Sequence, residues 1–489
     1  MLDELAAALR RHPDRPAVLT AGPTGRERVR ATRGELVDLA DGYAAALHAR
    51  GLGPGDTLGV AVRPGARALA LMLAAYRLGV RIAVLDPSAG PDVLTARLAL
   101  ARPALVVADA AAQAVAGWAR PLGRRAGLHL PPLADLGPVL TVGRRLPGCA
   151  PALEPVGGPA PDRTGTDGDT VIIFTSGTTS RPRAVVHGRA GLAAAMRAAA
   201  ELVDARPERP LLGGTFFVLV PALASGAPVA LPARRPRVLA RQLARLRPQA
   251  TYLTPPQLRA LLAERPRLSG AVYSGSAPVS AALLDRVRRA GADSAWGVYA
   301  LTELFPAAAV EATEKAAFTG DGDLVGAPLP GVRVRTDPSG ELLLTGPGQA
   351  DRYLGEPPWR WLRTGDVGRL VSDRIVLGGR CKDMVLRGAE NIYPGLYEPA
   401  LHVPGVELAV LVGVPAGDGD ERLVAVVQAE PDADPVRLRA ALGPVLDRMG
   451  AARPDELVFA PVPTAGRSRK PDRAAASALA ARRVGTVPR

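Results

Sequence analysis

Between residues 234 and 304, the spacing of apolar and polar residues switches repeatedly between two periods. A period near 3.6 residues predicts helices, and short apolar runs bounded by Gly, Pro or Ser predict strands. The predicted elements are, in chain order, a helix over Arg237–Leu246, a strand at Ala250–Leu253, a helix over Pro256–Ala263, a strand at Ala271–Tyr273, a helix after the N-cap residue Ser280 and a strand that leads into Tyr299. This alternation predicts an α/β fold with a parallel, helix-covered sheet.

Outside this region, the most apolar stretch is Ala68–Pro87. Arg77 and Arg81 interrupt it before about 20 apolar residues accumulate, so it predicts a buried helix followed by a strand and no membrane span. Residues 171–175 are a second apolar run and predict a strand that enters a polar loop.

The pattern changes after Arg380, where a smaller α/β unit is expected. Its predicted elements are a Gly-rich turn, a helix after Pro394, strands near Leu408–Val414 and Leu423–Gln428, and a helix from about Pro435 to Met449. A chain of 489 residues also exceeds the roughly 250–300 residues that one core usually supports. We therefore predict a large N-terminal domain of residues 1–380 with helix-covered β-sheets and a small C-terminal α/β domain of residues 381–489.

Composition narrows the class of protein. Cys149 and Cys381 are the only cysteines, which excludes a disulfide scaffold and a Cys-rich metal site. The acidic start of the chain lacks the basic region of a signal peptide, so we expect a cytoplasmic protein. The net charge is +14, but the arginines are spread along the chain and no nucleic-acid-binding motif is present. We expect no nucleic-acid partner, since a basic surface equally favours small anions or an acidic protein.

Lysine is rare in this chain. Of 61 basic residues only Lys315, Lys382 and Lys470 are lysines. A retained lysine is a candidate for a task that suits a compact, mobile ammonium better than a planar guanidinium. Lys315 lies in a polar stretch and is interpreted as chance retention.

A hydroxyl- and glycine-rich segment follows the strand at 171–175. Thr175, Ser176, Thr178 and Thr179 supply short donors, and Gly177 lets backbone N–H groups turn toward an anion. Arg181 or Arg183 then adds a planar, bidentate cation. The pattern predicts a phosphate-binding loop over residues 175–183, although a solvated linker is the alternative. The Gly-x4-Gly-Lys spacing of a P-loop is absent.

This phosphate loop resembles the Thr-Ser-Gly-Thr-Thr-Gly-x-Pro-Lys-Gly motif of the AMP-forming superfamily of acyl-CoA synthetases, adenylation domains and luciferases. The chain departs from the motif at Ser180, Arg183 and Ala184. The resemblance extends over nearly the whole chain, and later motifs follow in the family's order. It implies binding of ATP and Mg²⁺ and a C-terminal domain that is mobile.

The later motifs imply a role for each residue that matches. Gly275, Ser276, Ala277 and Pro278 are similar to the wall on which the adenine lies, although an ordinary strand-to-helix turn is the alternative. The remaining assignments are Tyr299 stacking on adenine, Thr302 bonding the α-phosphate, Glu303 holding Mg²⁺, Asp366 and Arg380 reaching the ribose, Lys382 acting as the pivot between domains, Gly388 in a loop that enters for the second step, and Lys470 as the catalytic lysine.

The resemblance implies a two-step ligase. A carboxylic acid, expected to be a fatty acid, attacks Mg·ATP to give acyl-AMP and pyrophosphate, and the acyl group then passes to coenzyme A. An acyl carrier protein is another possible acceptor. Segments such as Thr215–Pro221 and Thr302–Pro306 also resemble olefin β-lactone synthetases, so cyclisation of a β-hydroxy acid is an alternative. A non-catalytic nucleotide-binding relative is the third interpretation.

Overall fold

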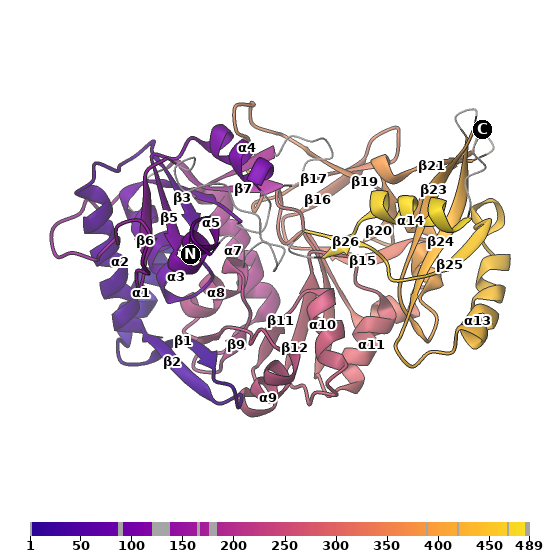
Figure 1. The fold of residues 1–489 in the computed structure, drawn as a ribbon, viewed down its shortest axis with the longest axis horizontal. Coiled ribbons are helices and arrows are strands. Elements are labelled where there is room, and N and C mark those ends of the chain that lie inside the picture. The colour runs from indigo at the N-terminus through magenta and orange to yellow at the C-terminus, as the bar shows by residue number, and fades with distance from the viewer. Residues whose placement is uncertain are drawn as a thin grey trace.

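The computed structural model describes residues 2–86, 91–119, 137–163, 167–175, 183–387, 390–417, 420–466 and 469–484. Within these ranges the strands gather into sheets of thirteen, seven and three strands and into two strand pairs. Figure 1 shows the ribbon, with the N-terminal half at the left and the C-terminal elements at the right. The mixed α/β class agrees with the prediction from the sequence.

The thirteen-stranded sheet carries most of the candidate site. In their order across the sheet, its strands are β16 (Arg333–Thr336), β17 (Glu341–Thr345), β19 (Leu362–Val371), β20 (Arg374–Arg380), β15 (Asp323–Pro328), β14 (Ala308–Glu311), β13 (Ser294–Tyr299), β12 (Ala271–Gly275), β11 (Ala250–Tyr252), β9 (Leu211–Leu212), β10 (Val229–Ala230), β1 (Pro16–Ala21) and β2 (Glu27–Thr32). Strands β13 to β1 are parallel to one another, whereas β14 to β16 continue the sheet in antiparallel pairs.

The parallel part of this sheet confirms the predicted alternation. Helices α9 (Pro236–Leu246), α10 (Pro255–Leu262) and α11 (Ala281–Arg289) separate its strands. Leu243, Leu258 and Leu284 bury their side chains in one apolar cluster beneath these helices. Ser280 caps α11 as predicted, since its Oγ accepts a hydrogen bond from the Leu283 N–H at 3.2 Å.

The seven-stranded sheet lies in the N-terminal half. In order, its strands are β18 (Arg352–Tyr353), β8 (Arg183–Gly188), β7 (Asp169–Thr175), β4 (Arg81–Val84), β3 (Thr57–Ala61), β5 (Leu105–Asp109) and β6 (Val139–Val142). Helices α4 (Pro91–Ala101) and α5 (Ala110–Ala116) connect strands of this sheet. The predicted strand at 171–175 is thus β7, inside the sheet.

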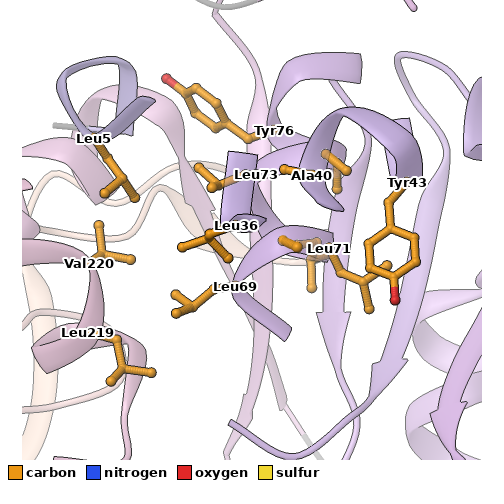
Figure 2. Close-up of a cluster of buried hydrophobic side chains, with 14 of the residues drawn as sticks. Leu5, Leu36, Ala40, Tyr43, Leu69, Leu71, Leu73, Tyr76, Leu219 and Val220 are labelled. Atoms are coloured by element: carbon orange, nitrogen blue, oxygen red, sulfur yellow. The ribbon is translucent and has the colours of Figure 1, made fainter. Parts of the chain in front are cut away.

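The main apolar core lies among four helices, α1 (Leu2–Arg11), α2 (Arg33–His48), α3 (Ala66–Leu78) and α8 (Phe216–Ala224). Figure 2 shows Leu5, Leu36, Leu69 and Leu219 converging from these helices. Helix α3 and strand β4 are the buried helix and strand expected for residues 68–87. None of the helices in the described ranges is long and apolar enough to cross a bilayer.

The C-terminal elements have cores of their own. They comprise β21 (Val385–Arg387), β22 (Glu390–Ile392), β23 (Val406–Gly417), β24 (Asp420–Ala429), α13 (Pro435–Asp447), β25 (Glu456–Phe459), β26 (Thr464–Ala465), β27 (Lys470–Pro471) and α14 (Arg473–Val484). Strands β23, β24 and β25 form the three-stranded sheet. Leu411 belongs to one apolar cluster and Val412 to another, so both faces of this sheet are buried.

One predicted element after residue 380 is wrong. The helix expected after Pro394 is absent, and the 3₁₀ turns η4 (Pro394–Leu396) and η5 (Glu398–Leu401) occupy its place. Pro399 has no N–H with which to continue an α-helix. Gly395 also approaches Gly379 so closely that a Cβ at residue 395 would lie 2.5 Å from the Gly379 Cα. Contact with β20 therefore overrides the local pattern.

Candidate active site

The two ends of the predicted phosphate loop lie side by side. Strand β7 ends at Thr175 and β8 begins at Arg183, and these two residues are paired in the antiparallel register. Arg183 is exposed. The predicted binding residues Ser176, Gly177, Thr178 and Thr179 lie outside the described residues. The structure therefore fixes where the loop starts and ends.

The predicted adenine wall follows β12 at the edge where the parallel strands end. Gly275 is packed tightly against β13, because a Cβ there would lie 2.7 Å from the Val298 carbonyl oxygen. Ser276 has a φ of +69°, which is unusual for a residue with a side chain, and its Oγ lies 2.9 Å from the Tyr252 Oη. Ala277 is half-buried and Pro278 is exposed. The segment is a strained turn that presents backbone at the sheet edge.

A buried carboxylate lies near the end of β13, the strand next to β12. Asp366 on β19 is 5% exposed. It accepts a hydrogen bond from the Tyr299 Oη at 2.6 Å and another from the Arg380 Nε at 2.7 Å. Burial, and then the Asp366 charge, raise the pKa of Tyr299 well above the usual tyrosine value, so its hydroxyl remains a donor. The Asp366–Tyr299–Arg380 triad joins residues that the sequence placed in three separate motifs.

Backbone pairing fixes the geometry of this triad. Asp366 and Arg380 are register partners on β19 and β20. The Asp366 N–H also donates to the Thr364 Oγ1 at 3.0 Å, and that hydroxyl donates to the Leu342 carbonyl at 2.8 Å. A carboxylate has about four lone-pair sites, so Asp366 can still accept hydrogen bonds from a ribose.

Lys470 approaches the same cluster from the C-terminal region. It lies on β27, which pairs with β26. Surrounding protein atoms lower the pKa of Lys470 from the usual lysine value, even though part of the residue remains exposed. The charges of Arg380 and Lys382 lower this pKa further, whereas Asp366 and Glu303 oppose the shift. The charges of Asp366 and Arg380 therefore act on the Lys470 ammonium.

The segment that carries Lys470 is tied to the predicted pivot. Arg473, three residues later, donates to both carboxylate oxygens of Glu398 at 2.7 Å and approaches the Asp383 carboxylate at 3.0 Å. Asp383 follows Lys382 in the 3₁₀ turn η3 (Cys381–Asp383), directly after β20. Lys382 is exposed in this turn. Gly388, assigned to the incoming loop, lies outside the described residues.

Thr302 and Glu303 follow β13 and are held through different groups. The buried His187 Nε2 lies 2.9 Å from the Thr302 carbonyl oxygen. Burial lowers the pKa of His187 to about 4, so at neutral pH its ring is uncharged and donates to this carbonyl. The Glu303 Oε1 accepts a hydrogen bond from the Tyr353 Oη at 2.8 Å. His187 is thus a structural support of the backbone at Thr302.

Tyr353 is the site residue that sequence reasoning missed. It lies on β18, and its ring packs under the Arg183 guanidinium, with the Arg183 Cζ 5.0 Å from the ring centroid. Burial and the Glu303 charge raise the pKa of Tyr353 to about 12. No local pattern marks it, because its two partners lie far away in the sequence.

The donor set near Glu303 fits Mg²⁺. In the ranges that the structure describes, no group of three His, Cys, Asp or Glu side chains is placed to enclose a metal ion. Mg²⁺ rarely uses such a cage and is commonly held by one or two carboxylates together with substrate phosphates and water. Glu303 is a single carboxylate that Tyr353 links to Arg183, at the end of the predicted phosphate loop, and this arrangement is consistent with that mode.

The comparisons with known sequences agree with the motifs. A sequence model of the AMP-binding enzyme family matches residues 5–354. CymA of Salinispora arenicola, described as a nonribosomal peptide synthetase, is 30% identical over 483 residues, covering 88% of this chain and 6% of that protein. Feruloyl-CoA synthase of an Amycolatopsis species is 29% identical over 324 residues, covering 59% of this chain and 65% of that protein. The chain spans less than two thirds of the length of either relative.

The structural comparison covers nearly the whole chain. The amide bond synthetase McbA from Marinactinospora thermotolerans superposes with a TM-score of 0.79 at 25% identity, covering 98% of this chain and 99% of that chain. The C-terminal elements are therefore included in the similarity, in addition to the residues that the family model matches.

Proposed function

Because the chain belongs to the AMP-binding enzyme family, we propose that it uses ATP to activate a small-molecule carboxylic acid as acyl-AMP and then transfers the acyl group to coenzyme A. The observation that carries this proposal is the Asp366–Tyr299–Arg380 triad, a buried carboxylate that accepts two hydrogen bonds at the end of the parallel strand β13. Structural tyrosine–aspartate pairs are common, but this one lies at the carboxyl end of a parallel strand, where the ligands of such sheets bind, and the charges of Asp366 and Arg380 act on Lys470.

Each group has a distinct task in the first step. The acid and the ATP phosphates are both anions, so the Lys470 ammonium lowers their repulsion and stabilises the charge that develops at the α-phosphate. Asp366 and Arg380 hold the ribose, and the turn at 275–278 receives the adenine. Thr302 and the phosphate loop orient the phosphates, leaving the α-phosphorus in line with the attacking carboxylate.

Mg²⁺ would be held by Glu303 and would supply further charge neutralisation at the phosphates. The hydrogen bond from the Tyr353 Oη fixes the position of that carboxylate. The neutral His187 ring holds the adjoining Thr302 backbone in place.

The acid is proposed to be apolar, as in a fatty acid. Helix α8, which begins at Phe216, consists entirely of apolar residues. Phe217 packs on Phe305 with ring centroids 3.7 Å apart, close to the buried His187. Phe216 and Phe217 are only partly buried against the main apolar core, and we propose that they line the acid pocket, which would favour an acid without a charged tail.

Pyrophosphate exchange tests the first step directly. A panel of fatty, β-hydroxy and aryl acids would be incubated with ATP, Mg²⁺ and labelled pyrophosphate, and label appearing in ATP would report acyl-AMP formation. We expect the highest exchange with an apolar acid. Absence of exchange with every acid would contradict an enzymatic role and favour a nucleotide-binding relative.

A second assay identifies the acceptor. Mass spectrometry would compare mixtures of acid and ATP that contain coenzyme A, a carrier protein, a simple amine or no acceptor. We expect the thioester of coenzyme A. The amine arm follows from the structural similarity to an amide bond synthetase. A β-lactone formed from a β-hydroxy acid without an acceptor would replace thioester formation as the second step.

A pH profile tests the environment of Lys470. Only the protonated ammonium can stabilise negative charge, and its pKa is lowered from the usual lysine value. The rate of acyl-AMP formation is therefore expected to fall as the pH rises through this lowered pKa. Lys470→Arg is expected to be slower but to lose this alkaline decline, since arginine stays charged. An unchanged decline in the variant would assign the titration to another group.

We further propose that residues 381–489 form a mobile domain that pivots at Lys382 between the two half-reactions. Proline fixes φ near roughly −65° and removes the backbone N–H. Lys382→Pro is expected to retain acyl-AMP formation but to transfer the acyl group poorly, because the loop assigned to the second step, which contains Gly388, would not be brought to the site. Single-turnover assays of each half-reaction would measure this. Equal loss of both would contradict the pivot.

A further inference from the structure

Tyr353 lies between two oppositely charged residues that the proposed function assigns to different parts of Mg·ATP. Its Oη donates to the Glu303 Oε1 at 2.8 Å, and its ring faces the Arg183 guanidinium at 5.0 Å. Among the described residues, the side-chain contacts of Glu303 and Arg183 are with Tyr353, and the two charges form no ion pair with each other. Tyr353 therefore contacts each charge while the two charges remain separate.

The position of the Tyr353 ring is fixed by its surroundings. Strand β18 pairs with β8, and Tyr353 is the register partner of Val185, two residues after Arg183. The edge of Trp359 packs against the ring with centroids 4.6 Å apart and planes at 71°. The Ala350 N–H donates to the Glu303 carbonyl at 2.7 Å, which ties the segment before β18 to the backbone of Glu303. The hydroxyl therefore has a defined direction.

The contacts of Tyr353 keep the charges of Glu303 and Arg183 apart. A carboxylate and a guanidinium this close to the same ring would attract each other, and an ion pair between them would neutralise both. Glu303 would then be a weaker ligand for a cation, and Arg183 a weaker partner for a phosphate. In the structure, the Tyr353 hydroxyl bonds one Glu303 oxygen and the Tyr353 ring supports the Arg183 guanidinium. Both charges therefore remain available to the ligand.

We propose that Tyr353 is a positioning residue that orients Glu303 toward Mg²⁺ and prevents it from pairing with Arg183. The inference rests on the proposed function, because it requires Mg·ATP to be the ligand of this site. The hydroxyl donates to Glu303, the ring lies under Arg183, and the Arg183 guanidinium also acts on the hydroxyl.

Two substitutions separate the role of the hydroxyl from that of the ring. Tyr353→Phe removes the hydroxyl and keeps the ring, so the apparent affinity for Mg²⁺ is expected to fall roughly 10-fold or more, as for other partners of metal ligands. ATP binding without metal is expected to weaken only slightly, because the ring still supports Arg183 although the freed Glu303 can now pair with it. Tyr353→Leu also removes the surface under Arg183, so it is expected to weaken ATP binding even without metal.

Binding, rather than turnover, is the main readout. Calorimetry would measure ATP binding to the full-length protein, without any acid, in EDTA and over a series of free Mg²⁺ concentrations. In turnover assays, Tyr353→Phe is expected to need more Mg²⁺ but to approach the wild-type kcat at saturating metal. If Tyr353→Phe lost activity only because its packing was damaged, its Tm would fall and added Mg²⁺ would not restore the activity.

Tyr76→Phe is the matched control, because the Tyr76 Oη also donates to a carboxylate, at 3.0 Å from the Asp3 Oδ1, between helices α3 and α1. It is expected to leave the Mg²⁺ dependence unchanged. The same Mg²⁺ dependence in Tyr353→Phe and wild type would overturn the positioning role while leaving the proposed function intact. Failure of the wild-type protein to bind Mg·ATP would overturn both.

Discussion

Replacing Lys470 with alanine is expected to slow acyl-AMP formation by roughly 10²–10³-fold, the scale on which removal of one electrostatic stabiliser usually acts. The effect is large because the ammonium is partly desolvated and lies near the triad, where a charge interacts more strongly than in bulk water. Arg380 is already paired with Asp366 and cannot replace it. Single-turnover pyrophosphate release would measure the loss.

Lys382→Ala is the control for Lys470→Ala. Lys382 is also a lysine whose charge reaches the site, but it is exposed in η3 and is assigned to the pivot. Its removal is expected to change the first half-reaction much less. Thermal unfolding and ATP binding are expected to be nearly normal in both variants. Wild-type pyrophosphate release by Lys470→Ala would contradict its assignment as the catalytic lysine.

The fold was predictable where local pattern and tertiary contacts agree. Between residues 234 and 304 each apolar face of a helix meets a parallel strand, so the period of the sequence determines the element. After Pro394, local pattern and tertiary contacts disagree. The pattern predicts a helix, whereas the close contact between Gly395 and Gly379 and the missing N–H of Pro399 favour 3₁₀ turns. Local pattern carries no information about such a contact.

The site was predictable as separate motifs but not as a network. Asp366 and Arg380 occur in two motifs, and the β19–β20 hairpin brings them together. The hydrogen bond from Tyr299 to Asp366 spans 67 residues, and the one from Tyr353 to Glu303 spans 50. Such partners depend on sheet order, which the sequence of one chain does not reveal. The scarcity of lysine was informative because it rests on chemistry rather than on local conformation.

Asp366→Asn is expected to weaken ATP binding roughly 10- to 100-fold. A hydrogen bond to a charged group contributes about 1.5–3 kcal/mol, and each 1.4 kcal/mol is a factor of ten in affinity. The substitution keeps the size of the side chain but leaves Arg380 without its anion, and an amide has only one oxygen to share between Tyr299 and a ribose. Fluorescence or calorimetric titration with Mg·ATP would measure the change.

The comparison with Asp41→Asn separates loss of a ligand group from general loss of an ion pair. Asp41 on α2 pairs with Arg77 on α3, among helices that pack away from the triad. This control is expected to bind ATP normally, with at most a small loss of stability, since exposed pairs contribute little. Asp366→Asn is expected to lose affinity at temperatures well below its Tm, so unfolding cannot explain the effect. If Asp366 served only the structure, its replacement would lower the Tm and leave the affinity for ATP unchanged. Wild-type ATP affinity in a folded Asp366→Asn protein would therefore contradict the ribose assignment.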